Sequence, residues 1–335
     1  MRYYKQNLAR GFFKLFILTF VLFIHLPNIY AQPTQSEFNK NENTGDFSFE
    51  VEILNDQLLI CEPLIIQIKI SNKSTETLRF TSSPFPGSDL TIDIRRPKRL
   101  PFEFISSSSG MTPEINQMLD PGEYRYYNYY VIFDNESDTG YLFTEPQEVV
   151  ISLKLRYGNT SGIKSKSWKS SPVKFKVLKP EGSCDEIRQS FMNKKTAASF
   201  QQLICDQNNV GIFEQALQKC THDCAYRPFI LFMLGRYYSG KSATSKDVTK
   251  STNYYNTLLE DYPDSFLADD ALLMTAVNLD EVGMKEEAKR ILIRLHNNYP
   301  HSDRASITDP IFKKYFDIKN SDEEPAINYL WMLFQ

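Results

Sequence analysis

One stretch of the sequence has the spacing of a phosphate-binding loop. Residues 235–242 read Gly-Arg-Tyr-Tyr-Ser-Gly-Lys-Ser, which matches the pattern Gly-x-x-x-x-Gly-Lys-Ser/Thr at every fixed position. Such a loop holds phosphate only between a buried strand and a helix N-terminus, where backbone amides converge on the anion. Residues 229–234 could supply that strand, but the polar run after Ser242 does not predict the helix. A nucleotide-binding enzyme built on residues 235–242 is therefore a remote alternative.

Cysteine and histidine could also carry chemistry in the C-terminal half. Residues 220–224, Cys-Thr-His-Asp-Cys, can be read as a zinc site, but zinc sites usually draw four ligands from paired clusters and this is the one tight cluster in the sequence. In an oxidising compartment cysteines of this kind form disulfides instead. We favour two disulfides with open connectivity, and we predict no metal and no cofactor. The four candidates are Cys184, Cys205, Cys220 and Cys224, and Cys61 remains an odd buried thiol.

Hydrolytic machinery is hard to assemble from this sequence. After the first 31 residues the chain has three histidines, and neither a zinc-protease helix pair nor a nucleophile-elbow string occurs. Acidic pairs such as Asp269-Asp270 and Glu286-Glu287 stand where solvated helix faces are expected. We therefore predict that the chain is not an enzyme.

The elements of the C-terminal half are marked by one phrase that occurs twice. Tyr-Pro-x-Ser-x-x-Ala begins at Tyr262 and again at Tyr299, 37 residues later. A fixed period of about 20 to 50 residues is typical of stacked helical units. Apolar stripes precede both prolines, and proline ends a helix. Ser265 is predicted to cap the helix that follows.

These residues resemble the tetratricopeptide repeat, a helix pair with small and large residues at fixed positions. Counted back from Pro300, the small positions are Ala276 and Ala288, and Leu292 takes the aromatic position. Counted back from Pro263, residues 234–238 supply Leu-Gly-x-x-Tyr, but the hairpin loop is longer than usual. In that first repeat, Tyr255 is the aromatic residue and Ser251 replaces alanine.

The resemblance implies a surface that binds a protein segment. It looks most like the Tyr-Pro-x-Ser variety in envelope proteins of the Tol-Pal and outer-membrane assembly systems. Its ligand-facing positions map to Phe232, Arg236, Ser239, Asp270, Val277 and Asp280. The final apolar residues, among them Leu330 and Trp331, are interpreted either as a closing cap or as a partner-binding tail.

The region before the helices has the two-residue period of strands. Residues 47–53, 64–70, 149–157 and 173–177 alternate apolar and polar side chains, and turn-forming groups separate them. With weaker segments such as 90–95 and 124–133, seven to nine strands are expected. That number in about 130 residues predicts a β-sandwich of the immunoglobulin-like kind. The fold class predicted is multidomain β plus α, an immunoglobulin-like β-sandwich followed by an α-helical tetratricopeptide-like array.

The first 31 residues are typical of an export signal. Four basic residues precede an apolar run over residues 15–26, which is too short for a comfortable membrane span. We expect cleavage after Ala31, with retention as an anchor as the other outcome. The predicted order is a signal peptide at 1–31, a flexible lead-in at 32–46, the sandwich at 47–179 and the helical domain at 180–335. Loss of the leader leaves 34 basic and 41 acidic side chains, a net charge of about −7, which disfavours nucleic acid as a partner.

A run of tyrosines offers a second function. In residues 124–130, alternation places Tyr127 and Tyr129 on one face and leaves Tyr124, Tyr126 and Tyr130 partly on the other. Exposed tyrosines could stack on sugars or contact a protein. The prediction is a non-catalytic interaction or scaffold protein of the bacterial envelope, periplasmic, outer-membrane-associated or secreted, with no membrane span in the mature chain. A carbohydrate or cell-wall binding protein is the alternative.

Overall fold

The structure is a computed structural model of the chain. It describes residues 47–55, 57–80, 90–97, 101–104, 117–157, 166–240, 247–302 and 304–305. The predicted leader, the lead-in and residues 306–335 lie outside the described residues.

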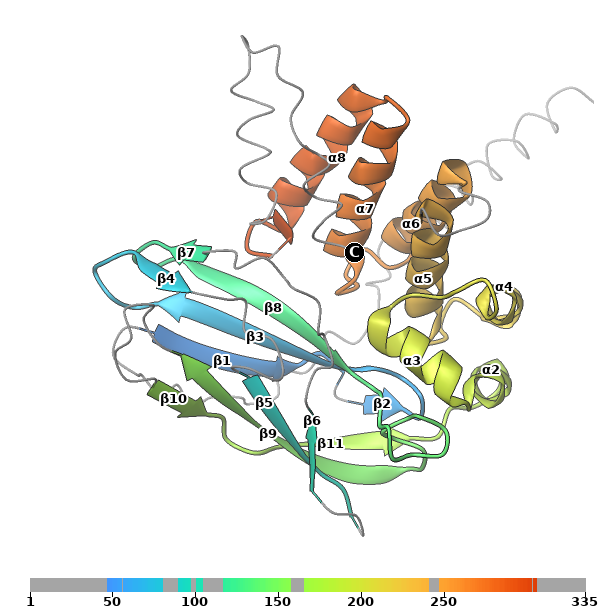
Figure 1. Cartoon of the computed structure of the whole chain (residues 1–335), viewed down its shortest axis with the longest axis horizontal. Coiled ribbons are helices and arrows are strands. Elements are labelled where there is room, and N and C mark those ends of the chain that lie inside the picture. Colours follow the sequence, from blue (N-terminus) through green and yellow to red (C-terminus); the bar gives the residue numbers. More distant parts are fainter. Residues whose placement is uncertain are drawn as a thin grey trace, which may run out of the picture. The chain divides into compact units, whose positions relative to one another are not determined.

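Strands occupy the N-terminal part of the described chain (Figure 1), as the alternation predicts. Their side chains alternate between core and solvent; in β11, for example, Val173, Phe175 and Val177 are buried while the intervening lysines are exposed. The short strands β2 and β7 carry no alternation of their own and were not predicted. The eleven described strands are β1 Phe47–Ile53, β2 Gln57–Leu59, β3 Leu64–Asn72, β4 Leu78–Phe80, β5 Leu90–Arg95, β6 Phe102–Phe104, β7 Gln117–Leu119, β8 Tyr124–Val131, β9 Gln147–Tyr157, β10 Lys166–Lys169 and β11 Val173–Leu178.

The strands form two larger sheets and one small one. The first sheet has the order β1-β3-β8, and the second has the order β2-β11-β9-β5-β6 with β10 paired to β9. β4 pairs with β7, and all these pairings are antiparallel except β2 with β11. Buried residues of both larger sheets, such as Ile68 and Ile151, belong to one apolar core. The immunoglobulin-like arrangement of these strands remains a prediction.

Helices follow the strands, as the change of period predicts. Each of α4 to α7 packs against the next described helix along the chain, which is how successive helical hairpins stack. No described helix combines the length and the apolar character that crossing a membrane requires. The described helices are α2 Ser183–Phe191, α3 Lys194–Gln202, α4 Val210–Lys219, α5 Arg227–Ser239, α6 Val248–Asp261, α7 Ala268–Glu281 and α8 Lys285–Asn298.

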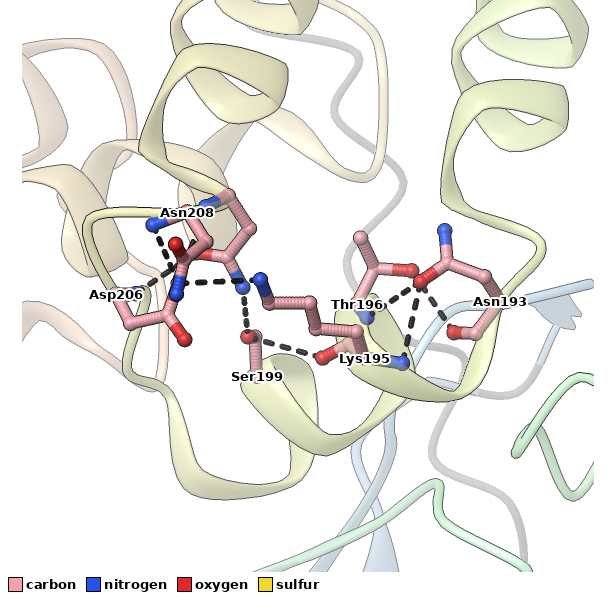
Figure 2. Close-up of polar contacts among 7 residues, drawn as sticks. Asn193, Lys195, Thr196, Ser199, Asp206 and Asn208 are labelled. Carbon is pink, nitrogen blue, oxygen red and sulfur yellow. Dashed lines mark hydrogen bonds and ion pairs between the residues drawn. The ribbon is translucent and has the colours of Figure 1, made fainter.

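Polar side chains cap the start of α3 and join α3 to the start of α4 (Figure 2). Asn193 is the N-cap of α3, and its Oδ1 accepts hydrogen bonds from the amides of Lys195 and Thr196 at 3.1 and 3.0 Å. Asn209 donates from Nδ2 to Ser199 Oγ at 2.6 Å, which joins the turn before α4 to the body of α3. Caps of this kind satisfy amides that a helix start leaves without partners. They hold in place the helices that precede the first repeat.

The helical residues pair with strand β8 along its outer edge. Gln201 donates from Nε2 to the Tyr130 carbonyl at 2.7 Å and accepts from the Ile132 amide at 3.0 Å. Further along, the Tyr126 amide donates to the His301 carbonyl at 3.0 Å. An edge strand presents unpaired main-chain groups that can recruit another chain. Here the Tyr126 amide and the Tyr130 carbonyl of that edge are bonded to the helical part of the same molecule.

Candidate functional site

The first repeat is closed by a glycine against a tyrosine. Gly235 lies in α5, and a Cβ added there would stand 2.6 Å from the Tyr255 ring of α6. Tyr255 is fully buried and its ring also packs at 5.7 Å from Phe232. The residue without a side chain therefore lets the ring lie directly on the α5 backbone. This packing explains the glycine of the Leu-Gly-x-x-Tyr match.

Ser251 takes the place of the small alanine of the first repeat and connects three helices. Its Oγ donates to the Gly235 carbonyl at 2.6 Å and accepts from Asn278 Nδ2 at 2.8 Å. These atoms come from α6, α5 and α7 respectively, and Ser251 and Asn278 are fully buried. A buried hydroxyl without partners would destabilise the fold, whereas this one has both. The serine that replaces alanine thus forms a hydrogen-bonded bridge between the two repeats.

The second repeat keeps the expected small and apolar residues. Ala276 of α7 and Ala288 and Leu292 of α8 are all buried. Gly283 joins the two helices with φ of 81°, a left-handed conformation that favours glycine at a helix end. The frame counted back from Pro300 is therefore occupied as the resemblance implies.

The tyrosine that opens each phrase binds the preceding turn. Tyr262 donates its hydroxyl to the His222 carbonyl, and Tyr299 donates to the Pro263 carbonyl at 2.7 Å. Each copy of the phrase is thus hydrogen-bonded to the backbone one repeat earlier. We did not predict this role of the two tyrosines from the sequence. The predicted capping by Ser265 was wrong: α7 begins at Ala268 with no side-chain cap, and Ser265 Oγ instead accepts from the Leu267 amide at 3.3 Å in the turn before the helix.

The six residues predicted to face a partner lie on α5 and α7, but most are covered. Phe232, Ser239, Asp270 and Val277 are buried, and Arg236 and Asp280 are half-buried. Asp270 accepts from Arg304 Nε at 2.5 Å, and burial lowers the pKa of Arg236, partly opposed by Tyr255 and Asp270. Their role in binding remains a prediction.

The phosphate-binding pattern falls in a helical context. Residues 229–239 belong to α5, so the strand that such a loop needs is absent from this described segment. From the sequence, the apolar residues 229–234 could have formed a strand or a helix. In the structure they are part of the longer helix α5, as the Leu-Gly-x-x-Tyr match implies. Lys241 and Ser242 lie outside the described residues.

One of the two predicted disulfides is present. Cys184 of α2 is bonded to Cys224 in the turn before α5, with Cα atoms 5.8 Å apart. Cys224 is therefore not a free thiolate for a metal. Cys205 and Cys220 are free and buried, so the second predicted disulfide was wrong. Burial raises the pKa of Cys205 to about 12 and of Cys220 to about 11, which keeps both as thiols near neutral pH.

The tyrosine strand has the predicted two faces. Tyr127 and Tyr129 are buried, whereas Tyr124, Tyr126 and Tyr130 are half-buried. The Tyr124 ring lies 4.0 Å from the His301 ring, and the Tyr130 ring lies 5.5 Å from that of Phe266. Both partners sit in the turns of the repeated phrase. These tyrosines are thus engaged by the helical part of the chain rather than presented as an open stacking platform.

Comparison with known families bears on the helices α7 and α8. The family described as tetratricopeptide repeat matches residues 270–302, the range that carries the second phrase. Residues 270–302 form a tetratricopeptide-type repeat. No curated protein matches the chain.

Similar solved structures share only small parts with this chain. A β-glucosidase from Erythrobacter marinus is 14% identical with a TM-score of 0.23, over 39% of this chain and 15% of that one. The C-terminal domain of wzt is 9% identical with a TM-score of 0.24, over 41% and 75%. Spo0M, a sporulation control protein from Bacillus subtilis, is 12% identical with a TM-score of 0.23, over 44% and 54%. Likenesses of this size carry no argument about function.

Proposed function

We propose that this chain is a non-catalytic interaction protein of the bacterial cell envelope that binds a protein segment through its helical repeats. The repeat match over residues 270–302 carries the proposal, because stacked helix pairs form extended surfaces suited to peptides. The bridge from Ser251 to Gly235 and Asn278 supports a second, adjacent repeat in the same stack. In the proposal the immunoglobulin-like module positions this stack through β8.

Export to the envelope is the second part of the proposal. The leader-like first 31 residues and the disulfide between Cys184 and Cys224 both favour an oxidising compartment outside the cytoplasm. Protein partners there would meet a mildly acidic chain whose α5 and α7 carry the half-buried charges Arg236 and Asp280.

The test is capture of envelope proteins on the immobilised mature chain. Charge reversal by Arg236→Glu or Asp280→Lys should lower recovery of a specific partner by roughly tenfold, the loss expected for one important interface residue. Arg290→Glu, on the exposed side of α8, is the matched control and should leave recovery unchanged. Equal recovery by all variants would argue against binding through these helices.

A further inference from the structure

One side of the second sheet is basic, although the chain without its predicted leader has 41 acidic and only 34 basic side chains. Val149, Ile151 and Leu153 of β9 are buried, so the residues between them lie on the other side of the sheet. Cross-strand pairing places residues of β5, β10 and β11 on that same side. Its exposed cations, which we term the basic face, are Arg95, Lys154, Lys169, Lys174 and Lys176.

Acidic neighbours do not neutralise the basic face. Lys154 and Lys169 lie directly opposite each other on β9 and β10, and like charges in that position are destabilising. On the same side the structure describes two carboxylates, Asp93 and Glu148, of which Glu148 lies opposite Lys176. The described residues form no ion pair with any of the five cations. The five cations and two carboxylates therefore leave three positive charges in excess.

The outer side of the first sheet differs in this respect. There Lys69 of β3 lies opposite Glu50 of β1, and its Nζ pairs with Glu50 Oε1 at 3.2 Å. Lysines on a sheet can also keep an edge strand from pairing with another chain. That reason does not apply to Lys154 and Lys176, because β9 and β11 each have a strand on both sides at these positions. Neither pairing nor edge protection accounts for the basic face.

The layout of the basic face favours an extended anionic surface over a compact ligand. Its cations are spread over four strands, and neighbouring strands lie about 4.8 Å apart. Across the sheet they pair with one another and with Gln57, Thr91, Glu148 and Val150. These partners include no aromatic ring on which a sugar or a base could stack. Mobile anionic headgroups of a bilayer can match separated lysines without a preformed pocket.

We propose that the basic face binds the surface of a bilayer that contains anionic phospholipids. The contact is peripheral and electrostatic, between lysine or arginine side chains and lipid headgroups. It goes beyond the proposed function, because it uses the second sheet and not the helical repeats. The helical part is hydrogen-bonded to β8 of the first sheet, so its attachment does not involve the basic face.

Cosedimentation of the mature chain with lipid vesicles tests the proposal. Vesicles of phosphatidylglycerol and phosphatidylcholine in equal parts should bind the chain at about 0.1 M salt and release it at about 1 M, because salt screens exposed charges. Vesicles of phosphatidylcholine alone should not bind it. The variant Lys154→Glu/Lys174→Glu should weaken binding to the anionic vesicles at least tenfold, since each cation near such a surface contributes about fivefold in affinity.

The matched control is Lys73→Glu/Lys285→Glu, which changes the net charge by the same amount. Both lysines are exposed, one in the turn after β3 and the other at the start of α8, away from the basic face. Binding by this variant should stay within about twofold of the parent. Lys154→Glu places a carboxylate opposite Lys169, so the test variant should keep the circular dichroism spectrum and unfolding midpoint of the parent. If it does not fold, Lys154→Gln/Lys174→Gln decides.

Three results would overturn the proposal. The first is no binding to anionic vesicles at the lower salt concentration, and the second is an equal loss of binding by the test and control variants. The third is tighter binding to heparin than to vesicles at the same concentration of anionic groups, lost in the test variant, which would assign the face to a soluble polyanion. Partner capture by the repeats is a separate measurement and does not depend on these results.

Discussion

The two repeats solve the same packing problem with different residue pairs. In the first, Gly235 of α5 admits the Tyr255 ring; the equivalent positions of the second hold the buried residues Ala276 and Leu292. Glycine with tyrosine and alanine with leucine have similar summed volumes, and cores tolerate exchanges that conserve volume. The repeat frame is therefore set by the summed volume at each helix crossing rather than by one residue type.

The repeats differ also in polarity. The first repeat buries Ser251 where the second has Ala288. Tyr238 and Lys250 of the first repeat also form a hydrogen-bonded group with Glu214 of α4. Positions equivalent to Tyr238 and Lys250 in the second repeat are Leu279 and Glu287. Polar contacts thus attach the first repeat to α4, the helix before it.

The largest expected effect comes from the disulfide upstream of the first repeat. Reduction, or Cys184→Ser, opens a link between residues 40 apart and should lower the free energy of unfolding by about 2–4 kcal/mol. Hydrogen exchange should accelerate in α2 to α5 before it does in α7 and α8. Equal acceleration in all helices would contradict an upstream attachment of the first repeat.

The glycine–tyrosine pair can be converted into the pair of the second repeat. Gly235→Ala should destabilise by about 1–3 kcal/mol through overpacking, because the new methyl group meets the Tyr255 ring. Adding Tyr255→Leu to this variant should recover part of the loss, measured by urea unfolding. Gly211→Ala in α4 is the control: its Cβ meets nothing within 4 Å, so it should not destabilise. A double variant no more stable than Gly235→Ala would show that the two pairs are not equivalent.

The serine bridge gives a smaller effect of counterintuitive sign. Ser251→Ala restores the residue typical of the repeat, yet it should destabilise by about 1–2 kcal/mol, because the buried Asn278 amide loses its acceptor. The combined variant Ser251→Ala with Asn278→Leu should be closer to the parent in urea unfolding. Stabilisation by the single change would contradict the bridge.

The smallest effect concerns Glu214. Its hydrogen bonds to Lys250 and then to Tyr238 lower its pKa in the folded state. A carboxylate with a lowered pKa contributes stability above its unfolded pKa, and that contribution is lost as the pH falls through the folded value. Glu214→Gln should therefore cost less than about 1 kcal/mol near pH 7, since the pair is partly exposed. The difference from the parent should vanish in acid; a difference that persists there would point to packing instead.

Elements that show as patterns of neighbouring residues were predicted from the sequence, whereas contacts between distant segments were not. Alternation located β1 and β9, and the recurring phrase located the turns around α7, because both signals come from neighbouring residues. The pairing of Cys184 with Cys224 and the hydrogen bond from Tyr126 to His301 join distant segments. No local period encodes such contacts. The short strands β2 and β7 depend on their partners for the same reason.

The candidate surface was predicted in position but not in exposure. The repeat frame placed Asp270 and Val277 on one face of α7, and both side chains are buried. Their burial could not be predicted, because it depends on what lies against that face rather than on α7 itself. The tetratricopeptide frame assigns ligand-facing positions from spacing alone, so it assigns them whether or not another segment covers them.

Site-specific photo-cross-linking tests the central claim most directly. A photoreactive residue at position 280, at the end of α7, should cross-link a protein partner in the envelope. The same residue at position 290, on the exposed side of α8, should give no such product. A partner cross-linked at position 290 and never at position 280 would contradict binding through α7.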